Sequence, residues 1–398
     1  MSLHTGRHIL QIPGPTNVPD RVLRAMDMPA MDHRGPEFAE LGFAVLEGMQ
    51  RMFRTRQPVI IYPSSGTGAW EAAIVNTLSP GDKVLMAETG QFAVLWRGIA
   101  EKFKLDVEFV PGDWRHGADI AAIEQRLAAD KAHSIKAVCV VHNETSTGCL
   151  TQPHEVRKAM DRAGHPALLM VDTISGLGSM EYEHDAWGDD VSVAGSQKGL
   201  MLPPGLGFNA VSEKAMAAAK ANPNLRSYWE WQEMLVFNKL GTFPYTPAIN
   251  LLYGLREALK MLLEEEGLDA VFARHQRHAE ATRRAVRAWG LEVLALDPRE
   301  YSPALTAVLM PAGHDADRAR KVILDAFDMS LGTGLGKLAG RVFRIGHLGD
   351  FNDLALMGTL AGVEMGLVLA GVPVKREGVD AAMDYISQCH GKPARAAA

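Results

Sequence analysis

Two stretches decide the fold, Ala167-Leu-Leu-Met-Val-Asp172 and Val191-Ser-Val-Ala-Gly-Ser-Gln-Lys-Gly199. Each is a short apolar run closed by polar residues and glycine, which is typical of a buried strand in a parallel sheet. The first run ends at Asp172 and the second leads to Lys198. Because α/β sheets build their ligand sites at the carboxyl ends of parallel strands, we expect both charged side chains at one edge of the sheet.

An acid and a lysine at such an edge have a specific chemical use. A lysine whose pKa is lowered by its surroundings can attack a carbonyl carbon. A carboxylate on the neighbouring strand can keep a ring nitrogen protonated, and pyridoxal phosphate needs both groups. These two residues alone leave an alternative open: Lys198 can be a surface residue whose stem packs on apolar groups, and Asp172 can be a helix N-cap.

Composition narrows the class of protein. The 398 residues, 47% of them hydrophobic, are enough for a large core in about two domains. A net charge of −6 provides no basic field for nucleic acid. The first eight residues lack the apolar core of a secretory signal, and no run reaches the ~18 apolar residues that span a bilayer. We therefore expect a cytoplasmic protein that binds neither nucleic acid nor membrane.

The three cysteines form no Cys-x-x-Cys pair; they are Cys139, Cys149 and Cys389. An odd number in a chain of this length indicates reduced thiols rather than a disulfide framework. The spacing predicts no metal site.

From residue 59 onward the pattern alternates between strand and helix. The candidate strands, besides the two above, are Val59–Tyr62, Lys83–Ala87, Val107–Val110, Ala137–Val141 and Gly207–Val211. The candidate helices are Thr67–Leu78, Phe92–Phe103, Ile120–Ala129 and His154–Ala163. This alternation predicts an α/β fold with a mainly parallel, doubly wound sheet.

The two ends of the chain follow other patterns. Ile9–Pro19 contains three prolines and predicts an extended arm. An aromatic segment, Asn222–Thr246, precedes a long predicted helix from Pro247 to Glu266, which Gly267 ends. The remainder mixes helices and strands in another order: Leu268–Trp289, Leu291–Leu296, Leu305–Met310, Asp315–Phe327, Val342–Gly346 and two closing helices. We predict an arm (1–17), a large domain (18–266) and a smaller α+β domain (267–398).

Four further stretches are candidates for a binding site. Tyr62–Glu71 is a strand, a turn of small residues and a helix start, which suits a phosphate but is also an ordinary capped turn. His142–Gly148 gathers short polar side chains that can bind a phenolate-type oxygen or simply close a turn. Phe92 can lie over a flat ring or belong to the core. Arg344 lies in an apolar strand, where it needs either a carboxylate ligand or an ion pair.

Nine short motifs occur in a particular order: Pro13–Asn17, Ser65–Gly68, His142–Thr145, Val171–Asp172, Gly195–Gly199, Pro203–Gly205, Tyr245–Pro247, Tyr253–Ala258 and Phe343–Gly346. In these motifs and their order the chain resembles the class V, fold-type I aminotransferases over nearly its whole length. The resemblance is greatest to the serine–glyoxylate, alanine–glyoxylate and serine–pyruvate group. It implies pyridoxal 5'-phosphate as cofactor and a large domain that binds it.

The resemblance assigns roles around the cofactor. Lys198 would be the Schiff-base lysine and Asp172 the partner of the pyridine nitrogen. The phosphate would be held by Ser65, Gly66, Thr67 and Gln197 of one subunit and by Tyr245 and Thr246 of the other, which implies a homodimer with shared active sites.

The faces of the ring and the substrate have their own residues in this resemblance. Phe92, where relatives often have tryptophan, would stack on one face of the ring and Ile174 would pack on the other. Thr145 would bond near the ring oxygen. Arg344 would bind the substrate α-carboxylate, with the backbone at Gly14 helping to close the site.

The implied reaction moves an amino group from a small L-amino acid to glyoxylate and gives glycine and a 2-oxo acid. Serine, which yields hydroxypyruvate, is the favoured donor, with alanine–glyoxylate, aspartate–glyoxylate and serine–pyruvate transfer as alternatives. A cysteine desulfurase on the same scaffold would need a mobile reactive cysteine, which the sequence does not indicate. A more remote alternative is a cofactor-free binding protein on this fold.

Overall fold

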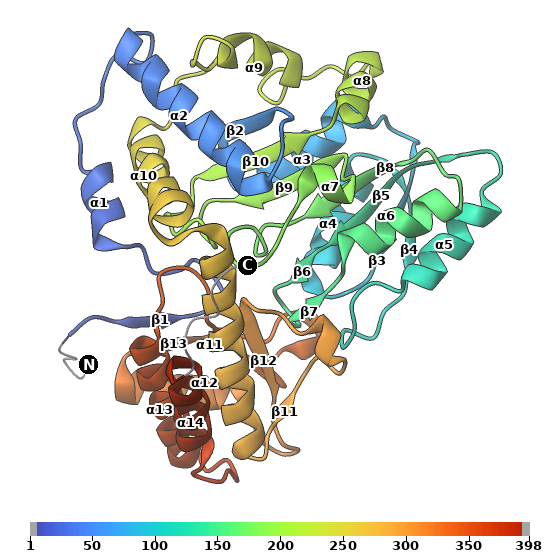
Figure 1. Cartoon of the computed structure of the whole chain (residues 1–398). Helices are drawn as coiled ribbons and strands as arrows, with labels where there is room; N and C mark the ends of the chain where they lie inside the picture. Colours follow the sequence, from blue (N-terminus) through green and yellow to red (C-terminus); the bar gives the residue numbers. More distant parts are fainter. Residues whose placement is uncertain (1–5, 392–398) are drawn as a thin grey trace.

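The computed structural model describes residues 6–391, so the ends of the predicted arm and small domain at 1–5 and 392–398 lie outside the described part. A large α/β layer structure occupies one end of the molecule and a smaller sheet with its helices the other (Figure 1). The helix α11 (Leu268–Ala288) runs between the two.

The large sheet has seven strands in the order β2-β10-β9-β8-β5-β3-β4. Their bounds are β2 (Val59–Pro63), β3 (Lys83–Ala87), β4 (Asp106–Val110), β5 (Ile135–Val141), β8 (Leu168–Asp172), β9 (Val191–Gly195) and β10 (Leu206–Val211). Only β10 is antiparallel to its neighbours. The remaining pairs are parallel, which confirms the predicted mainly parallel sheet.

Both faces of this sheet are buried under helices, as its nearly continuous apolar strands predict. In β8, Leu169 and Val171 face a core shared with four helices: α2 (Pro36–Phe53), α5 (Ile120–Ala129), α6 (Pro153–Arg162) and α10 (Ile249–Lys260). Leu168 and Met170 face the opposite core, with α3 (Gly66–Thr77), α4 (Gln91–Lys102), α8 (Glu213–Ala221) and α9 (Trp231–Asn238). The apolar side chains of β8 thus alternate between the two cores, and Asp172 is the last residue of the strand, at its carboxyl end.

The small sheet has the order β1-β13-β14-β12-β11. Its strands are β1 (Ile9–Gln11), β11 (Glu292–Val293), β12 (Leu305–Leu309), β13 (Met329–Thr333) and β14 (Val342–Gly346). It packs on α11, α12 (Ala316–Phe327), α13 (Asp353–Leu369) and α14 (Gly378–His390). The first strand of the chain lies parallel to β13, so the arm begins in the small sheet and then crosses to the large one.

The shorter elements are α1 (Asp20–Met26), α7 (His184–Trp187), the hairpin strands β6 (Asn143–Glu144) and β7 (Cys149–Leu150), and the 3-10 turns η2 (Pro298–Glu300) and η3 (Gly336–Leu338). No helix among residues 6–391 combines the length and apolar character needed to cross a membrane.

Two predicted elements are wrong in detail. The helix expected over Pro247–Glu266 is α-helical only to residue 260 and then continues as a π-helical turn, η1 (Met261–Glu266), before Gly267 at φ +82. The strand expected over Leu291–Leu296 shrinks to β11, because the amide of Leu296 turns away from the ladder and donates to the carbonyl of Arg115. The strand β13 and the helices α8 and α9 were not predicted.

Candidate active site

Asp172 is the last residue of β8 and lies at the carboxyl edge of the large sheet. Only 4% of it is exposed, and its Oδ1 accepts a hydrogen bond from the Ile174 amide at 2.7 Å. Burial raises the pKa of this carboxyl to about 7. A cation placed beside a buried carboxyl group stabilises its ionised form.

Lys198 follows the neighbouring parallel strand β9 and is 7% exposed. Burial, together with the positive charge of Arg344, lowers the pKa of its ammonium group to about 8. The negative charge of Asp172 acts in the opposite direction on this pKa. The structure therefore places the predicted acid and amine at one edge, within electrostatic reach of each other.

The arm crosses directly over this lysine. The Nζ of Lys198 donates to the Pro13 carbonyl at 2.5 Å, and the Thr16 hydroxyl donates to the Lys198 carbonyl at 3.2 Å. Gly14 has φ +95, and a Cβ built on it would lie 2.4 Å from Cδ of the lysine. Only glycine fits this close approach, which brings the predicted residue Gly14 into the site.

The start of α3 leaves its first amide groups without a side-chain cap. Ser65 is the N-cap residue, with extended backbone, but its side chain bonds no amide of the first turn. A Cβ on Gly195 would lie 2.9 Å from Oε1 of Gln197 and 3.3 Å from the amide nitrogen of Gly66, so these two atoms face the same space. The Gln197 oxygen is buried and has no hydrogen-bond partner among residues 6–391. Thr67, exposed, stands in the same turn, and the whole forms a cradle for an anion.

Ile174 lies beside this cradle, and Phe92 lies at the start of the next helix, α4. Ile174 contacts Gly66 so closely that a Cβ there would come within 2.3 Å of its Cδ1. Phe92, in the first turn of α4, is half-buried, and both side chains pack against the same core of the large sheet. The structure brings the predicted ring-facing residues to the same edge as Asp172.

Thr145 and Arg344 meet on the side of the small sheet. Arg344 lies within β14, is 6% exposed, and donates from Nη1 to the Thr145 carbonyl at 2.7 Å and from Nε to the Thr333 carbonyl at 2.8 Å. Among residues 6–391 its hydrogen-bond acceptors are thus backbone carbonyls rather than an acid. Burial lowers its pKa to about 10, which leaves the guanidinium charged and suited to a carboxylate ligand. The Thr145 hydroxyl donates to Oγ of Ser175 at 2.6 Å.

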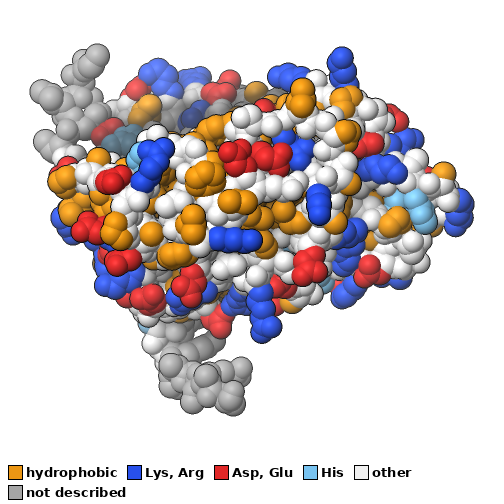
Figure 2. Space-filling view, turned by 90° about the horizontal axis from the view of Figure 1, so that it is seen from above, with side chains coloured by type: hydrophobic (Ala, Val, Ile, Leu, Met, Phe, Trp, Pro, Cys, Tyr) orange, Lys and Arg blue, Asp and Glu red, His pale blue; other side chains and the backbone are white. Residues whose placement is uncertain are grey.

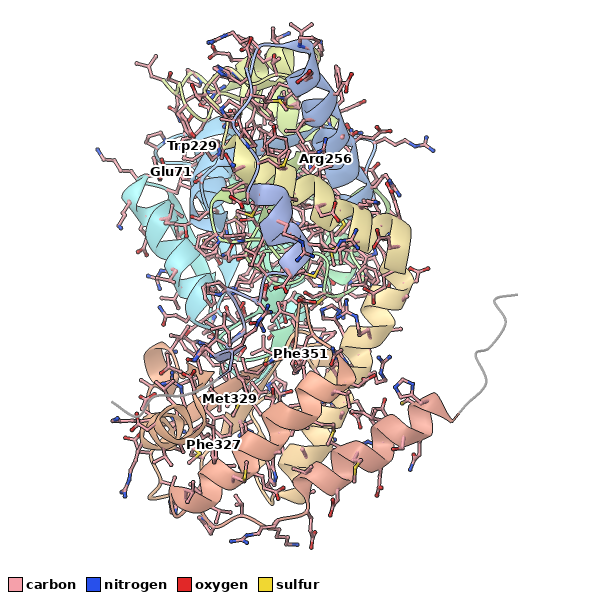
Figure 3. All side chains as sticks on the ribbon, turned by 90° about the vertical axis from the view of Figure 1, so that its left-hand side faces the viewer. Glu71, Trp229, Arg256, Phe327, Met329 and Phe351 are labelled. Carbon is pink, nitrogen blue, oxygen red and sulfur yellow. The ribbon has the colours of Figure 1, made fainter. Side chains whose placement is uncertain are left out.

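Tyr245 lies against strand β2 of its own chain, and Thr246 follows it. The Tyr245 hydroxyl donates to the carbonyl of Ile61 in β2, and the centre of its ring lies 5.2 Å from that of Tyr228. Thr246 is exposed. The adjoining Trp229 donates to Glu71 of α3 at 2.9 Å, and Figure 3 shows these two side chains side by side at the edge of the large domain.

These residues fit a flat ring that carries a protonated nitrogen and a phosphate. The nitrogen would supply the cation that buried Asp172 lacks, and the phosphate would occupy the uncapped start of α3 next to the unpartnered Gln197 oxygen. The residues 6–391 hold no cluster of three or more His, Cys, Asp or Glu placed to bind a metal.

Sequence reasoning missed three contributors to the site. The Pro13 carbonyl, the Ser175 hydroxyl and the buried carboxylate of Glu144 all contact predicted residues from positions distant in the chain. The polar cluster at residues 142–148 includes Glu144, but the sequence does not indicate which group its carboxylate binds. Its neighbour His142 is buried with its Nδ1 unbonded, and burial lowers its pKa to about 3, so it is neutral.

Comparison with known proteins bears on these observations. A family model described as aminotransferase class-V matches residues 9–335. The serine–glyoxylate aminotransferase of Methylorubrum extorquens is 49% identical over 96% of this chain and 97% of its own length. The L-aspartate–glyoxylate aminotransferase of Paracoccus denitrificans is 44% identical over 96% of this chain and 97% of its own. The crystal structure of the ureidoglycine–glyoxylate aminotransferase from Bacillus subtilis has a TM-score of 0.88 and 28% identity over 97% of this chain and all of its own, which confirms the predicted fold.

Proposed function

Because this chain belongs to the class-V aminotransferases, we propose that it transfers the amino group of L-serine to glyoxylate with pyridoxal 5'-phosphate as its cofactor. The observation that carries the proposal is the pairing of Lys198 and Asp172 at the ends of two neighbouring parallel strands. Their buried surroundings move both pKa values toward neutrality. Strongly shifted pKa values of this kind are typical of catalytic groups.

In this proposal the cofactor is held at both ends. The start of α3, from Ser65 to Thr67, and the side chain of Gln197 bind its phosphate, and Asp172 holds its ring nitrogen protonated. Phe92 and Ile174 cover the two faces of the ring, and Thr145 lies near its oxygen. When bound, pyridoxal phosphate supplies the electron sink that makes the Cα–H bond of an amino acid acidic and carries the amino group between substrates.

The protein's own groups then move the proton and orient the substrates. With a pKa of about 8, Nζ of Lys198 is neutral in about half of the molecules near pH 8, so it can take the Cα proton of the donor and return a proton in the reverse direction. The donor and the acceptor each carry a carboxylate, and Arg344 orients both through it. Gly14, which has no side chain, lets the arm cross close over the lysine.

The choice of substrates rests on the relatives rather than on the geometry. Serine is favoured because a serine–glyoxylate aminotransferase is 49% identical to this chain. Aspartate stays as an alternative donor because an aspartate–glyoxylate aminotransferase is 44% identical, and alanine–glyoxylate and serine–pyruvate transfer stay open as well. Arg344 binds a group that all of these substrates share and does not separate them.

A desulfurase reaction is disfavoured by the state of the cysteines. Burial raises the pKa of the Cys139 and Cys149 thiols to about 12, and Cys389 lies on α14 in the small domain. A thiol of that pKa carries almost no thiolate at neutral pH.

The experiment that tests the proposal is a matrix of amino donors against oxo acids. Purified protein loaded with pyridoxal phosphate is given serine, alanine or aspartate with glyoxylate, pyruvate or oxaloacetate, and the amino acid products are quantified. Serine with glyoxylate should give the highest kcat/KM and yield glycine. A protein that stays colourless with pyridoxal phosphate and turns over no pair would instead be a cofactor-free binding protein.

We further propose that two copies of the chain form a dimer with shared sites. Exposed apolar side chains occur on α9 and in the segments that flank it: Leu225, Val236, Phe237 and Leu240. The face that Figure 2 shows from above carries hydrophobic side chains across its middle. Apolar surface of this kind is typical of an interface. A cytoplasmic location stays a prediction from the sequence.

Subunit mixing tests the sharing directly. Lys198→Ala and Tyr245→Ala chains are co-expressed under separate tags, and the mixed dimer is purified. If Tyr245 serves the partner's cofactor, one of its two sites has both residues intact, so about half of the wild-type activity should return. If Tyr245 serves its own chain, to whose Ile61 carbonyl it donates here, the mixed dimer should be as inactive as the two single variants.

A further inference from the structure

The first turn of α4, which carries Phe92, is capped by a side chain from a distant part of the chain. Its N-cap residue is Gly90, which has no side chain to offer. Instead, Glu144 accepts the Phe92 amide on Oε1 at 3.3 Å and the Ala93 amide on Oε2 at 3.1 Å. Both carboxylate oxygens thus hold the backbone at and after the aromatic residue.

Ser146 completes this cap. Its Oγ accepts the amide of Gln91 at 2.9 Å and donates to Glu144 Oε1 at 2.7 Å. The Ser146 amide donates to the same carboxylate oxygen at 3.0 Å. The first three amides of α4 are therefore satisfied within the protein, whereas those of α3 have no side-chain cap. The carboxylate of Glu144 occupies the start of α4, whereas the start of α3 stays available for a phosphate.

The neighbourhood is built around this carboxylate. Glu144 is fully buried, and burial raises its pKa. A Cβ on Gly90 would lie 2.4 Å from Oγ of Ser146 and 2.5 Å from Cγ of Glu144, so a side chain at position 90 would expel the cap. The residue next to Glu144, Thr145, accepts the Arg344 guanidinium on its carbonyl at 2.7 Å.

We propose that Glu144 is a positioning residue that fixes Phe92 against the cofactor ring. This inference rests on the proposed function, because it takes Phe92 to be the residue that covers the ring. The carboxylate fixes the first turn of α4 by hydrogen bonds to its backbone, and the favourable end of the helix dipole adds to their strength. The same hairpin holds Arg344 through Thr145, so one short segment sets the distance between the ring-covering residue and the carboxylate-binding residue.

The test compares Glu144→Gln with a cap variant far from the site. Glutamine keeps the size of the side chain but removes the charge and one of the two acceptor oxygens. The control is Asp119→Ala, which removes the side-chain cap of α5, an acceptor for the Ala122 amide at 2.9 Å. Both variants lose a helix cap, and only the first touches Phe92.

Two readouts besides turnover separate positioning from general support. They are the dissociation constant of pyridoxal phosphate and the visible circular dichroism of the bound cofactor, which depends on the side chains around the ring. Glu144→Gln should weaken cofactor binding about tenfold and reduce the visible band. Asp119→Ala should leave the cofactor affinity and the visible band as in the wild type, even if it lowers the melting temperature by as much as Glu144→Gln does.

Unchanged affinity and an unchanged visible band in Glu144→Gln would overturn the inference. If that variant does not fold, Ser146→Ala decides, because it removes the Gln91 contact and one support of the carboxylate. It should weaken cofactor binding about threefold, and wild-type values for it would overturn the inference as well. A wild-type protein that binds no pyridoxal phosphate would refute the proposed function itself, a result distinct from either of these.

Discussion

Replacing Asp172 by asparagine separates the charge of this carboxyl group from its shape. The amide oxygen of asparagine can still accept the Ile174 amide, which lies 2.7 Å from Oδ1 of Asp172. In the cofactor-free protein, burial raises the pKa of Asp172 from 3.8 to about 7. The folded state then binds this proton more tightly than the unfolded state does, so the free energy of unfolding falls as the pH rises from 3.8 through 7.

The size of the effect follows from the shift. A pKa change of about three units corresponds to about 4 kcal/mol, at 1.36 kcal/mol per unit. At pH 8 the cofactor-free wild type carries this cost and the asparagine variant does not. The variant should therefore be more stable than the wild type at pH 8 by up to about 4 kcal/mol, and the difference should disappear below about pH 4. The same variant should bind pyridoxal phosphate about 10- to 100-fold more weakly, because the protonated ring nitrogen loses its anionic partner.

Urea unfolding of the cofactor-free proteins at pH 4 and pH 8, with a cofactor titration, measures both effects. Asp189→Asn is the matched control. Asp189 is also fully buried with a pKa raised to about 7, but it precedes β9 and so lies at the opposite edge of the sheet. Its variant should change stability without changing cofactor affinity. A variant at Asp172 that is less stable than the wild type at pH 8, or that binds the cofactor as tightly, would refute the reasoning.

Three further predictions concern the other groups of the site. The rate of pyridoxal phosphate association should rise with pH with a midpoint near 8, where Lys198 loses its proton, and a rate independent of pH between 6 and 9 would contradict the lowered pKa. Arg344→Gln should lower kcat/KM for the amino donor about 10- to 100-fold, while replacing the exposed Arg341, which directly precedes β14, by glutamine should leave it unchanged; equal effects would speak against carboxylate binding at Arg344. Gly14→Ala should weaken cofactor binding about tenfold, because alanine is strained at φ +95 and its Cβ, 2.4 Å from Cδ of Lys198, would push that side chain aside. Gly358→Ala in α13, with nothing within 4 Å, should bind the cofactor normally and gain about 0.5–1 kcal/mol in stability.

The parts of the fold that the sequence predicts are those with a local signal. An apolar run such as Leu168–Val171, closed by polar residues, is typical of a buried strand, and a charged residue at the end of a parallel strand is expected at the edge of the sheet. The same reasoning located Lys198 after β9. The alternation of strands with helices then fixed the mainly parallel arrangement, which the structure confirms.

The parts that the sequence does not predict depend on contacts between distant positions. Glu144 reaches an amide 52 positions earlier in the chain, and β1 pairs with β13, where Ile9 lies opposite Met329. The sequence around Glu144 does not identify the amides that it binds, because a carboxylate can accept a hydrogen bond from any backbone amide. The sequence of β1 likewise does not identify β13, because strands pair through their backbones. The π-helical turn after residue 260 was missed for a related reason, since its residues, Met261–Glu266, suit an α-helix equally well.

Covalent trapping of the cofactor tests the central claim most directly. The purified protein is incubated with pyridoxal phosphate, reduced with borohydride, digested and analysed by mass spectrometry for the lysine that carries the phosphopyridoxyl group. We expect that group on Lys198 alone, and a Lys198→Ala protein should carry none. A modification on another lysine, or none in the wild-type protein, would contradict the assignment of Lys198 and Asp172 to one cofactor.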